Sequence, residues 1–140
     1  EALGPYLAGG IGTNRGKVLI GTVAGDMHDI GKNMVVTMLK GVGFEVMDLG
    51  INVAREKFVE TVAQFKPDIL GLSALLTTTM TEMRHVIASL EAAQLRHTCK
   101  ILVGGAPVSE NFANEIGADG FAPDAVEAVT IAKRLIARHR

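Results

Sequence analysis

Short apolar runs alternate with amphipathic segments from residue 17 to the end of the chain. Runs rich in β-branched residues predict strands, and apolar residues spaced three and four apart predict helices. The predicted strands span residues 17–23, 44–49, 69–73, 101–103 and 120–122, and the predicted helices span residues 32–40, 55–65, 79–93, 110–116 and 124–137. Asp124 and Glu127 have the spacing of a capping box, which predicts the start of the last helix.

Strands that alternate with helices in this way require a parallel sheet covered by helices on both faces. The segment Ile69-Leu70-Gly71-Leu72 is apolar throughout, as in a central strand that is buried on both faces. We therefore predict a doubly wound α/β fold, Rossmann-like or flavodoxin-like, with five parallel strands in the order 2-1-3-4-5. In this order the ligand crevice opens beyond the carboxyl ends of strands 1 and 3, so the loops after Val23 and Leu72 are the first candidates for chemistry.

The composition is that of a single soluble domain. The chain has 140 residues, of which 48% are hydrophobic and 21% are charged. Aromatic residues are scarce, so we expect an aliphatic core. Residues 1–16 contain five glycines and a proline without a clear period, which predicts a linker before a domain at residues 17–140.

Charge and cysteine content narrow the function classes. The net charge is −1 and both signs are scattered, which argues against a nucleic-acid-binding surface. The one basic cluster, formed by Lys133, Arg134, Arg138 and Arg140, falls in the last turns of the final helix, where cations complement the helix dipole. A single cysteine, Cys99, fits a reducing cytoplasm, and no apolar run approaches the ~20 residues of a membrane span. We predict a cytoplasmic protein without membrane or nucleic-acid partners.

The loop after the first strand carries the most specific signal. An imidazole, His28, stands between two carboxylates, Asp26 and Asp29. The spacing Asp26-x-His28 lets a carboxylate reach one ring nitrogen while the other nitrogen faces the crevice, which is the carboxylate–histidine–metal arrangement. Asp29 is better placed as the N-cap of the first helix.

One histidine does not hold a free metal ion, because zinc sites use three or four protein ligands. His85 is predicted mid-helix, His97 precedes strand 4, and His139 is near the terminus, so none of them completes a site. A single histidine with an orienting aspartate suits a metal that is already held in a macrocycle and needs one axial ligand.

Three other motifs do not fit these loops. Gly25 and Gly31 have five residues between them rather than the four of a phosphate loop, and Asn33 replaces the Ser or Thr that binds magnesium. The dinucleotide fingerprint G-x-G-x-x-G is absent after strand 1. A phosphoacceptor site of the response-regulator kind fails because strand 3 ends in Ser73 rather than a carboxylate.

Three sequence elements, each at a strand end, carry a family resemblance. They are Asp26-x-His28-x-x-Gly31, then Ser73-x-Leu75, then Gly104-Gly105. The chain resembles, over about residues 16 to 138, cobalamin-binding domains with the signature D-x-H-x-x-G, S-x-L and G-G. The run DMHDIGKN is most similar to the methyl-transfer branch of this family.

The resemblance implies a cobalamin or related corrinoid cofactor whose own base leaves the cobalt, with His28 as the lower axial ligand. It also implies that Asp26 accepts the other ring N–H and that the Thr79 hydroxyl completes a His–Asp–hydroxyl relay. The remaining implied cofactor contacts are at Asp29, Ile30 and Gly31, in the nucleotide-tail channel at Ser73, Leu75 and Thr77, and in the space left by Gly104 and Gly105.

The implied function is a corrinoid-binding methyl carrier that works with a substrate-specific methyltransferase and an acceptor methyltransferase and turns nothing over alone. Such families usually place a helical domain before the corrinoid domain, and residues 1–16 would be the linker from it. Two alternatives remain: the corrinoid domain of an adenosylcobalamin-dependent mutase, and a cobalamin-sensing regulatory module.

Several of these residues also have purely structural interpretations. Thr79 and Glu82 form a capping box, so Thr79 can be a helix start as well as a relay member. Lys32 is predicted to project into solvent, and His85 and His97 to lie on the surface. Cys99 is predicted to be a packed or half-exposed thiol, and core positions are predicted for the methionines at helical spacing, Met34, Met38, Met80 and Met83.

Overall fold

A five-stranded parallel sheet forms the centre of the computed structural model, which describes residues 15–139. The predicted linker, residues 1–16, lies outside the described residues except for Arg15 and Gly16. Adjacent strands follow the order β3-β2-β4-β5-β6, which confirms the predicted order 2-1-3-4-5. The strands are β2 (Lys17–Thr22), β3 (Glu45–Asp48), β4 (Ile69–Ser73), β5 (Lys100–Gly104) and β6 (Gly120–Ala122).

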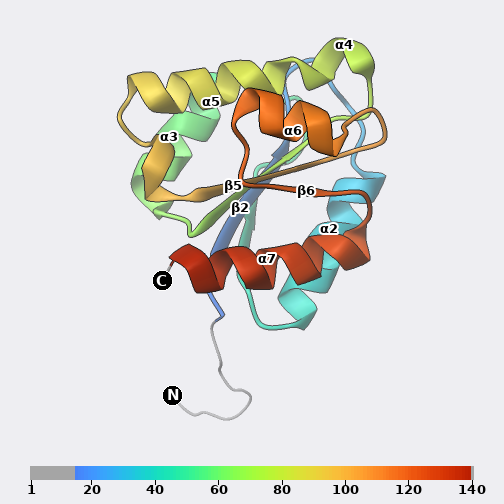
Figure 1. Ribbon diagram of the computed structural model, residues 1–140, viewed down its shortest axis with the longest axis vertical. Coiled ribbons are helices and arrows are strands. Elements are labelled where there is room, and N and C mark those ends of the chain that lie inside the picture. The colour runs from blue at the N-terminus through green and yellow to red at the C-terminus, as the bar shows by residue number, and fades with distance from the viewer. Residues whose placement is uncertain (1–14, 140) are drawn as a thin grey trace.

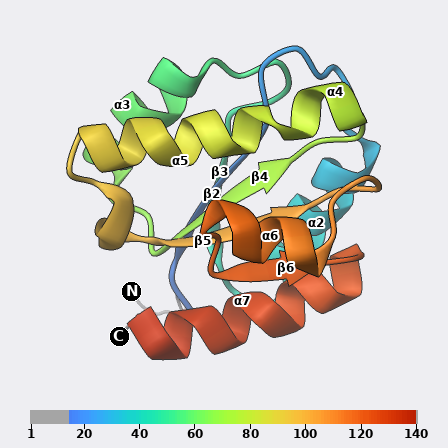
Figure 2. The ribbon, with the colours of Figure 1, turned by 45° about the horizontal axis from the view of Figure 1, so that its top comes forward.

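Helices cover both faces of the sheet (Figure 1). On one face lie α3 (Arg55–Phe65), α5 (Glu82–Ala92) and α6 (Glu110–Ile116), and on the other lie α2 (Ile30–Gly41) and α7 (Ala125–His139). The short helix α4 (Thr77–Met80) precedes α5, and a 3-10 turn, η1 (Arg96–Thr98), precedes β5. Figure 2 shows α4 and α2 toward the same end of the molecule, where the strands end.

The sheet separates two aliphatic cores. Leu19 and Leu70 point into the larger core beneath α3, α5 and α6, where Phe58 is fully buried. Val18 and Ile69 point into the smaller core beneath α2 and α7. Side chains alternate between the faces of a strand, so the apolar run in β4 serves both cores, as the sequence predicted.

The strand register places residues of the α2/α7 face in two parallel rows. The inner row consists of Ile20, Gly71 and Leu102. The outer row lies two residues nearer the carboxyl edge and consists of Thr22, Ser73, Gly104 and Ala122. Both rows share the face of Val18 and Ile69, because residues two apart on a strand point the same way. The ends of β2, β4, β5 and β6 therefore meet at one edge through mostly small residues.

Lys32 does not project into solvent, contrary to the prediction. Its side chain is 2% exposed, and its Nζ lies 2.7 Å from Asp48 Oδ2 and 2.6 Å from Asn33 Oδ1. Asp48 is the last residue of β3, so the pair ties the first turn of α2 to the edge strand. A buried ammonium is tolerated there because it is paired and hydrogen-bonded.

The methionines follow the core prediction only in part. Met83 is fully buried, and Met38 and Met80 pack against the two cores. Met34 is 55% exposed, so its assignment to the core was wrong. Helix α2 packs through Val36 and Leu39, which leaves Met34 on another side of the helix.

The capping prediction at Thr79 was also wrong, and the one at Asp124 was right. The segment divides into α4 and α5, so Thr79 lies inside α4, and Glu82 binds Arg55 of α3 through two hydrogen bonds of 2.9 and 3.0 Å. At the last helix, the Glu127 backbone N–H donates to Asp124 Oδ1 at 2.8 Å. Helix α7 begins at Ala125, the residue after Asp124.

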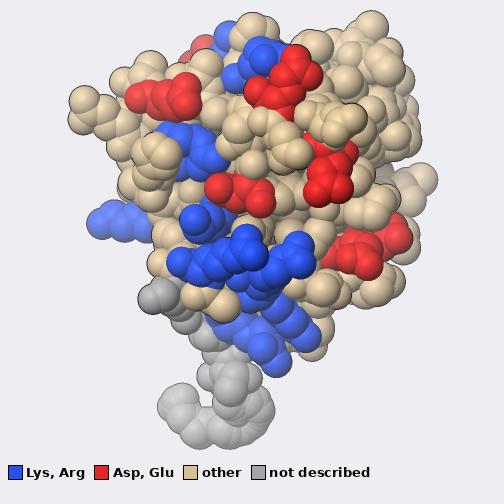
Figure 3. All heavy atoms as spheres, in the orientation of Figure 1, with Lys and Arg blue, Asp and Glu red and all other residues tan. Residues whose placement is uncertain are grey.

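The predictions for the other histidines, the cysteine and the charges agree with the structure. His85 and His97 are exposed, whereas Cys99 is buried, and burial raises the pKa of its thiol to about 11. Lysine and arginine side chains gather over the C-terminal end of α7, at Lys133, Arg134 and Arg138 among others (Figure 3). None of the helices in residues 15–139 has the length and hydropathy to cross a bilayer.

Two glycines provide opposite tests of this packing. A Cβ on Gly105 would lie 1.8 Å from the Ala74 carbonyl oxygen, and its φ of +128° is strained for other residues, whereas a Cβ on Gly31 would meet nothing within 4 Å. We expect Gly105→Ala to lower the free energy of unfolding by about 2 kcal/mol or more. Gly31→Ala, in the first turn of α2, is expected to raise it by up to about 1 kcal/mol. Urea unfolding followed by circular dichroism measures both, and an unchanged Gly105→Ala midpoint would contradict the packing described.

Candidate functional site

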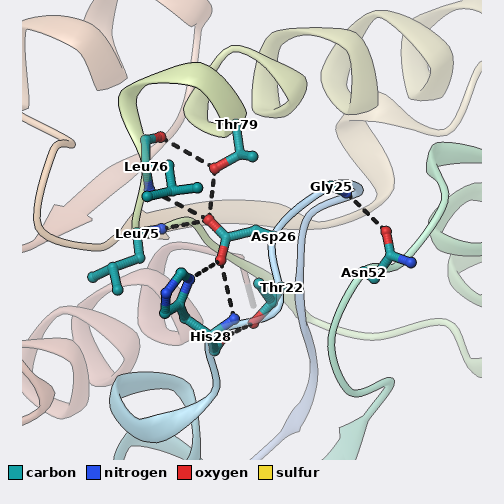
Figure 4. A network of polar contacts seen from close by, with 8 residues as sticks. All are labelled: Thr22, Gly25, Asp26, His28, Asn52, Leu75, Leu76 and Thr79. Carbon is teal, nitrogen blue, oxygen red and sulfur yellow. Dashed lines mark hydrogen bonds and ion pairs between the residues drawn. The ribbon is translucent and has the colours of Figure 1, made fainter.

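Asp26 and His28 lie in the loop that leads from β2 to α2 (Figure 4). The Asp26 side chain is fully buried, while the His28 side chain is 50% exposed. The loop therefore holds its carboxylate inside the molecule and presents the attached imidazole at the surface.

The Asp26 carboxylate accepts five hydrogen bonds, which is a dense set for one side chain. Oδ1 accepts from the His28 backbone N–H at 3.1 Å and from His28 Nδ1 at 2.8 Å. Oδ2 accepts from the Leu75 N–H at 2.7 Å, the Leu76 N–H at 3.3 Å and the Thr79 hydroxyl at 2.6 Å. One carboxylate thus joins the loop after β2 to the loop after β4 and to α4.

These hydrogen bonds keep Asp26 ionised. Burial by itself raises the pKa of the carboxyl, but the hydrogen bonds from Thr79, Leu75 and His28 outweigh it and hold the pKa well below its usual range. An ionised carboxylate can only accept hydrogen bonds, so the proton between the two side chains belongs to His28 Nδ1.

The position of that proton decides which nitrogen is available as a ligand. With Nδ1 protonated and bonded to Asp26, neutral His28 carries its lone pair on Nε2. Nε2 makes no hydrogen bond to any part of the chain that the structure describes. The half-exposed ring thus offers one nitrogen donor whose orientation is fixed by the carboxylate partner.

A second set of contacts fixes the backbone of the loop, and the sequence reasoning did not identify it. The Thr22 hydroxyl donates to the His28 carbonyl at 3.0 Å. Asn52, after β3, donates from its backbone to the Asp26 carbonyl at 2.9 Å and accepts from the Gly25 N–H through its side chain at 2.8 Å. Asn52 has a φ of +51°, in the left-handed region that asparagine tolerates. Its place just after strand 2, beside strand 1 in the predicted order, was the available signal.

Beside His28 a cavity of about 540 Å³ opens between the sheet and helices α2 and α7. His28, Asp29, Ile30 and Gly31 contribute to its lining from the start of α2, and Ser73 and Gly104 from the strand ends. The cavity exists because the carboxyl-terminal part of the central strand β4 has only Gly71 and Ser73 on this face, so little side-chain volume fills the space beneath the two helices.

Most of the predicted cofactor contacts surround this cavity. Its lining includes His28, Asp29, Ile30, Gly31, Ser73, Leu75, Gly104 and Gly105. Asp26 and Thr79 are buried behind His28, as the relay requires. Thr77 begins α4 and lies outside the cavity lining, and Asp29 occupies the N-cap position of α2 without a side-chain capping bond. The roles of these residues toward a cofactor remain predictions.

The two adjacent glycines at the end of β5 have a structural reason as well. A Cβ on Gly104 would lie 2.9 Å from the Ala122 carbonyl, and one on Gly105 would overlap the Ala74 carbonyl. Close backbone approach between neighbouring strand ends thus requires both glycines, whatever the cavity binds.

The donor set does not match an ordinary metal site. In residues 15–139 no group of three or more His, Cys, Asp or Glu side chains is arranged to hold a metal ion. The surface around His28 is instead apolar, with Met27 61% exposed, Ile30 78% and Leu75 42%. One oriented imidazole within an exposed apolar rim suits a large apolar ligand that brings its own metal.

The Thr79 hydroxyl is expected to contribute to stability mainly through its bond to Asp26. Thr79→Val leaves the ionised Oδ2 with one donor fewer and should lower the free energy of unfolding by about 1–3 kcal/mol. Thr79→Ser keeps the hydroxyl and loses one methyl, so it should cost about 1 kcal/mol. Urea unfolding at pH 7 compares the two, and a Val variant as stable as the Ser variant would contradict the importance of this bond.

The lowered pKa of Asp26 predicts a dependence of stability on pH. Above the ordinary carboxyl pKa of about 4 the carboxylate contributes its full stabilisation. As the pH falls from there toward the lowered pKa of the folded state, the unfolded chain takes up a proton that folded Asp26 does not, and the stabilisation is lost. The difference in unfolding free energy between wild type and Asp26→Asn should therefore shrink between pH 6 and pH 3. Asp29→Asn, which removes a neighbouring exposed carboxylate, is the control.

Comparison with known proteins identifies several relatives. Residues 16–130 match the B12 binding domain family model. The chain is 45% identical over 127 residues to a corrinoid protein of Desulfitobacterium hafniense, covering 91% of this chain and 59% of that protein. It is 46% identical over 129 residues to dimethylamine corrinoid protein 3 of Methanosarcina mazei, covering 92% and 77%.

A solved structure agrees with the sequence relatives. The methanol:cobalamin methyltransferase complex from Methanosarcina barkeri superposes with a TM-score of 0.83 at 33% identity, covering 93% of this chain and 50% of that chain. This chain is thus similar in sequence and in fold to part of larger corrinoid proteins. With the family model matched over most of its length, the chain belongs to the B12-binding domain family, whose cofactor is a cobalamin or related corrinoid.

Proposed function

We propose that this chain is the corrinoid-binding, methyl-carrying domain of a cobalamin-dependent methyltransferase system, with His28 as the lower axial ligand in the base-off, His-on mode. The single observation that carries the proposal is the Thr79–Asp26–His28 relay, which orients Nε2 outward at the mouth of the cavity.

The residues present fit a corrinoid in three respects. A metal held in a macrocycle needs one protein ligand, and the site offers one imidazole. The exposed apolar rim of Met27, Ile30 and Leu75 suits the face of a large ring. The cavity beside it, of about 540 Å³, gives space for a nucleotide tail that has left the metal.

The relay's task is to hold His28 in one tautomer and one orientation. Asp26 remains unprotonated near neutral pH because its pKa is lowered, so the proton between the two side chains stays on Nδ1, and a neutral ring then has its lone pair on Nε2. Thr79 and the Leu75 N–H stabilise the negative charge on the carboxylate from the other side. The corrinoid, when bound, supplies the cobalt chemistry of methyl transfer, and the chain supplies binding, orientation and electrostatics.

The names of the relatives favour methyl transfer over the alternatives. The dimethylamine corrinoid protein and the methanol:cobalamin methyltransferase complex both belong to methyl-transfer chemistry. We therefore propose two partners, a substrate-specific methyltransferase that loads the domain and an acceptor methyltransferase that unloads it. A mutase domain and a cobalamin-sensing module remain the alternatives, and neither has an observation in its favour here.

The place of this domain in a larger protein is part of the proposal. The chain spans 59% of the corrinoid protein of Desulfitobacterium hafniense, so residues 17–140 would form the corrinoid domain of a longer cytoplasmic chain. Residues 1–16 would be the linker from an upstream helical domain.

Isotope labelling gives a direct test of the axial ligand. We expect the ¹⁵N-labelled chain, loaded with unlabelled cobalamin and reduced to Co(II), to show a doublet superhyperfine pattern in its EPR spectrum, because ¹⁵N has spin one-half. The cofactor's own ¹⁴N base would give a triplet instead. His28→Ala should abolish the doublet, and His85→Ala, at an exposed histidine on α5, should keep it. A triplet in the labelled wild type would overturn His28 ligation.

A further inference from the structure

The buried end of the cavity differs in chemistry from its mouth. On the sheet side it is formed by the inner row, in which Ile20 and Leu102 flank Gly71 on neighbouring strands. On the helix side Val35 of α2 and Ala128 of α7 face it. Ile20 is 5% exposed, Leu102 6% and Ala128 3%, so these residues mark the inner end.

Hydrogen-bonding groups are scarce at this inner end. The backbone N–H and C=O groups of the inner row belong to the parallel ladder between β2, β4 and β5. Lys32 is the buried lining residue with a polar side chain among those the structure describes, and its ammonium is engaged by Asp48 and Asn33, which are not in the lining. Its stem therefore adds to the apolar wall, while its charge is paired outside the cavity.

Polar side chains are found instead where the cavity opens. His28, Asp29 and Asp124 are exposed, and Ser73, in the outer row, is half-buried. The rim thus combines these polar side chains with the exposed apolar ones of Met27, Ile30 and Leu75, whereas a group that reaches the inner end lies against aliphatic side chains alone.

On the basis of the function proposed above, we propose that this cavity selects corrinoids by the polarity of their nucleotide base, accepting an apolar benzimidazole-type base and disfavouring a purine. A benzimidazole presents a hydrocarbon edge to Ile20, Val35, Leu102 and Ala128. A purine of similar size would bury ring nitrogens and an exocyclic amine against the same side chains, where they would lose their hydrogen bonds to water without replacement.

The test compares three commercially or biosynthetically accessible corrinoids on the wild-type chain. Cobalamin has a benzimidazole base, the adeninyl cobamide differs from it in carrying a purine base, and cobinamide has no nucleotide. Equilibrium dialysis with detection by visible absorbance gives the three dissociation constants. We expect cobalamin to bind at least roughly tenfold more tightly than the adeninyl cobamide, which corresponds to one or more unpaired buried polar groups.

A matched pair of variants assigns the discrimination to the inner end. Leu102→Gln introduces an amide that can bond to a purine, and Leu102→Met has a similar length without a hydrogen-bonding group. We expect the Gln variant to reduce the preference for cobalamin severalfold, the Met variant to retain it, and neither to change the affinity for cobinamide. Circular dichroism checks the fold of both, and the wild-type comparison decides the proposal even where the Gln variant is unfolded.

The outcomes separate this inference from the proposed function. Equal or tighter binding of the adeninyl cobamide, with the His28-dependent EPR doublet intact, overturns the base selection alone. Failure of all three corrinoids to bind, or a doublet that survives His28→Ala, overturns the proposed function instead. A cobalamin preference that Leu102→Gln leaves unchanged in a folded variant shows that selection arises elsewhere and also contradicts the inference.

Discussion

The buried charge of Asp26 is the interaction on which the site depends. Removing a carboxylate from water costs several kcal/mol unless donors replace the water, and here five donors from three segments do so. Each of these segments is thereby held in place by the same side chain: the loop after β2, the loop after β4, and α4. The position of the His28 ring follows from this, because its Nδ1 is one of the five donors. The carboxylate that ties these segments together is thus also the one that holds the imidazole.

The second constraint is the small size of the residues on one face of the central strands. Gly71 and Ser73 on β4, with Gly104 on β5, put little side-chain volume on this face in the two rows nearest the carboxyl edge of the sheet. The helices above them, α2 and α7, then enclose a cavity rather than a packed core. Further from the edge, Val18 and Ile69 restore ordinary packing. Gly104 also permits the close approach of backbones, because a Cβ there would lie 2.9 Å from the Ala122 carbonyl oxygen. Its presence in the sequence thus has two causes that only the structure separates.

Particular residues show where sequence reasoning succeeds and where it stops. The strand at Ile69–Ser73 and the helices at Arg55–Phe65 and Glu110–Ile116 were predicted to the residue, because each has a strong local period and clear boundaries. Lys32 was misplaced because its burial depends on Asp48, sixteen positions away on another strand. Thr79 was considered a possible helix cap because Thr79 and Glu82 have capping-box spacing. In the structure Thr79 donates to Asp26 instead, and Glu82 is paired with Arg55. Met34 follows the apolar spacing of its helix, but it lies on a side of the helix that does not face the core.

The sequence by itself determined the fold class and the strand order, and it singled out Asp26 and His28 as a pair, because these depend on local periodicity, on the rules of parallel sheets and on a motif compact enough to read along the chain. The tertiary structure alone decided how the Asp26 carboxylate is buried and held, since this depends on Thr79 and Leu75 reaching Asp26 across about fifty positions of chain. It also decided the shape and apolar character of the cavity, because these arise where strands and helices that are far apart in the sequence meet. Local patterns fix what each segment becomes, and long-range contacts fix how the segments face one another.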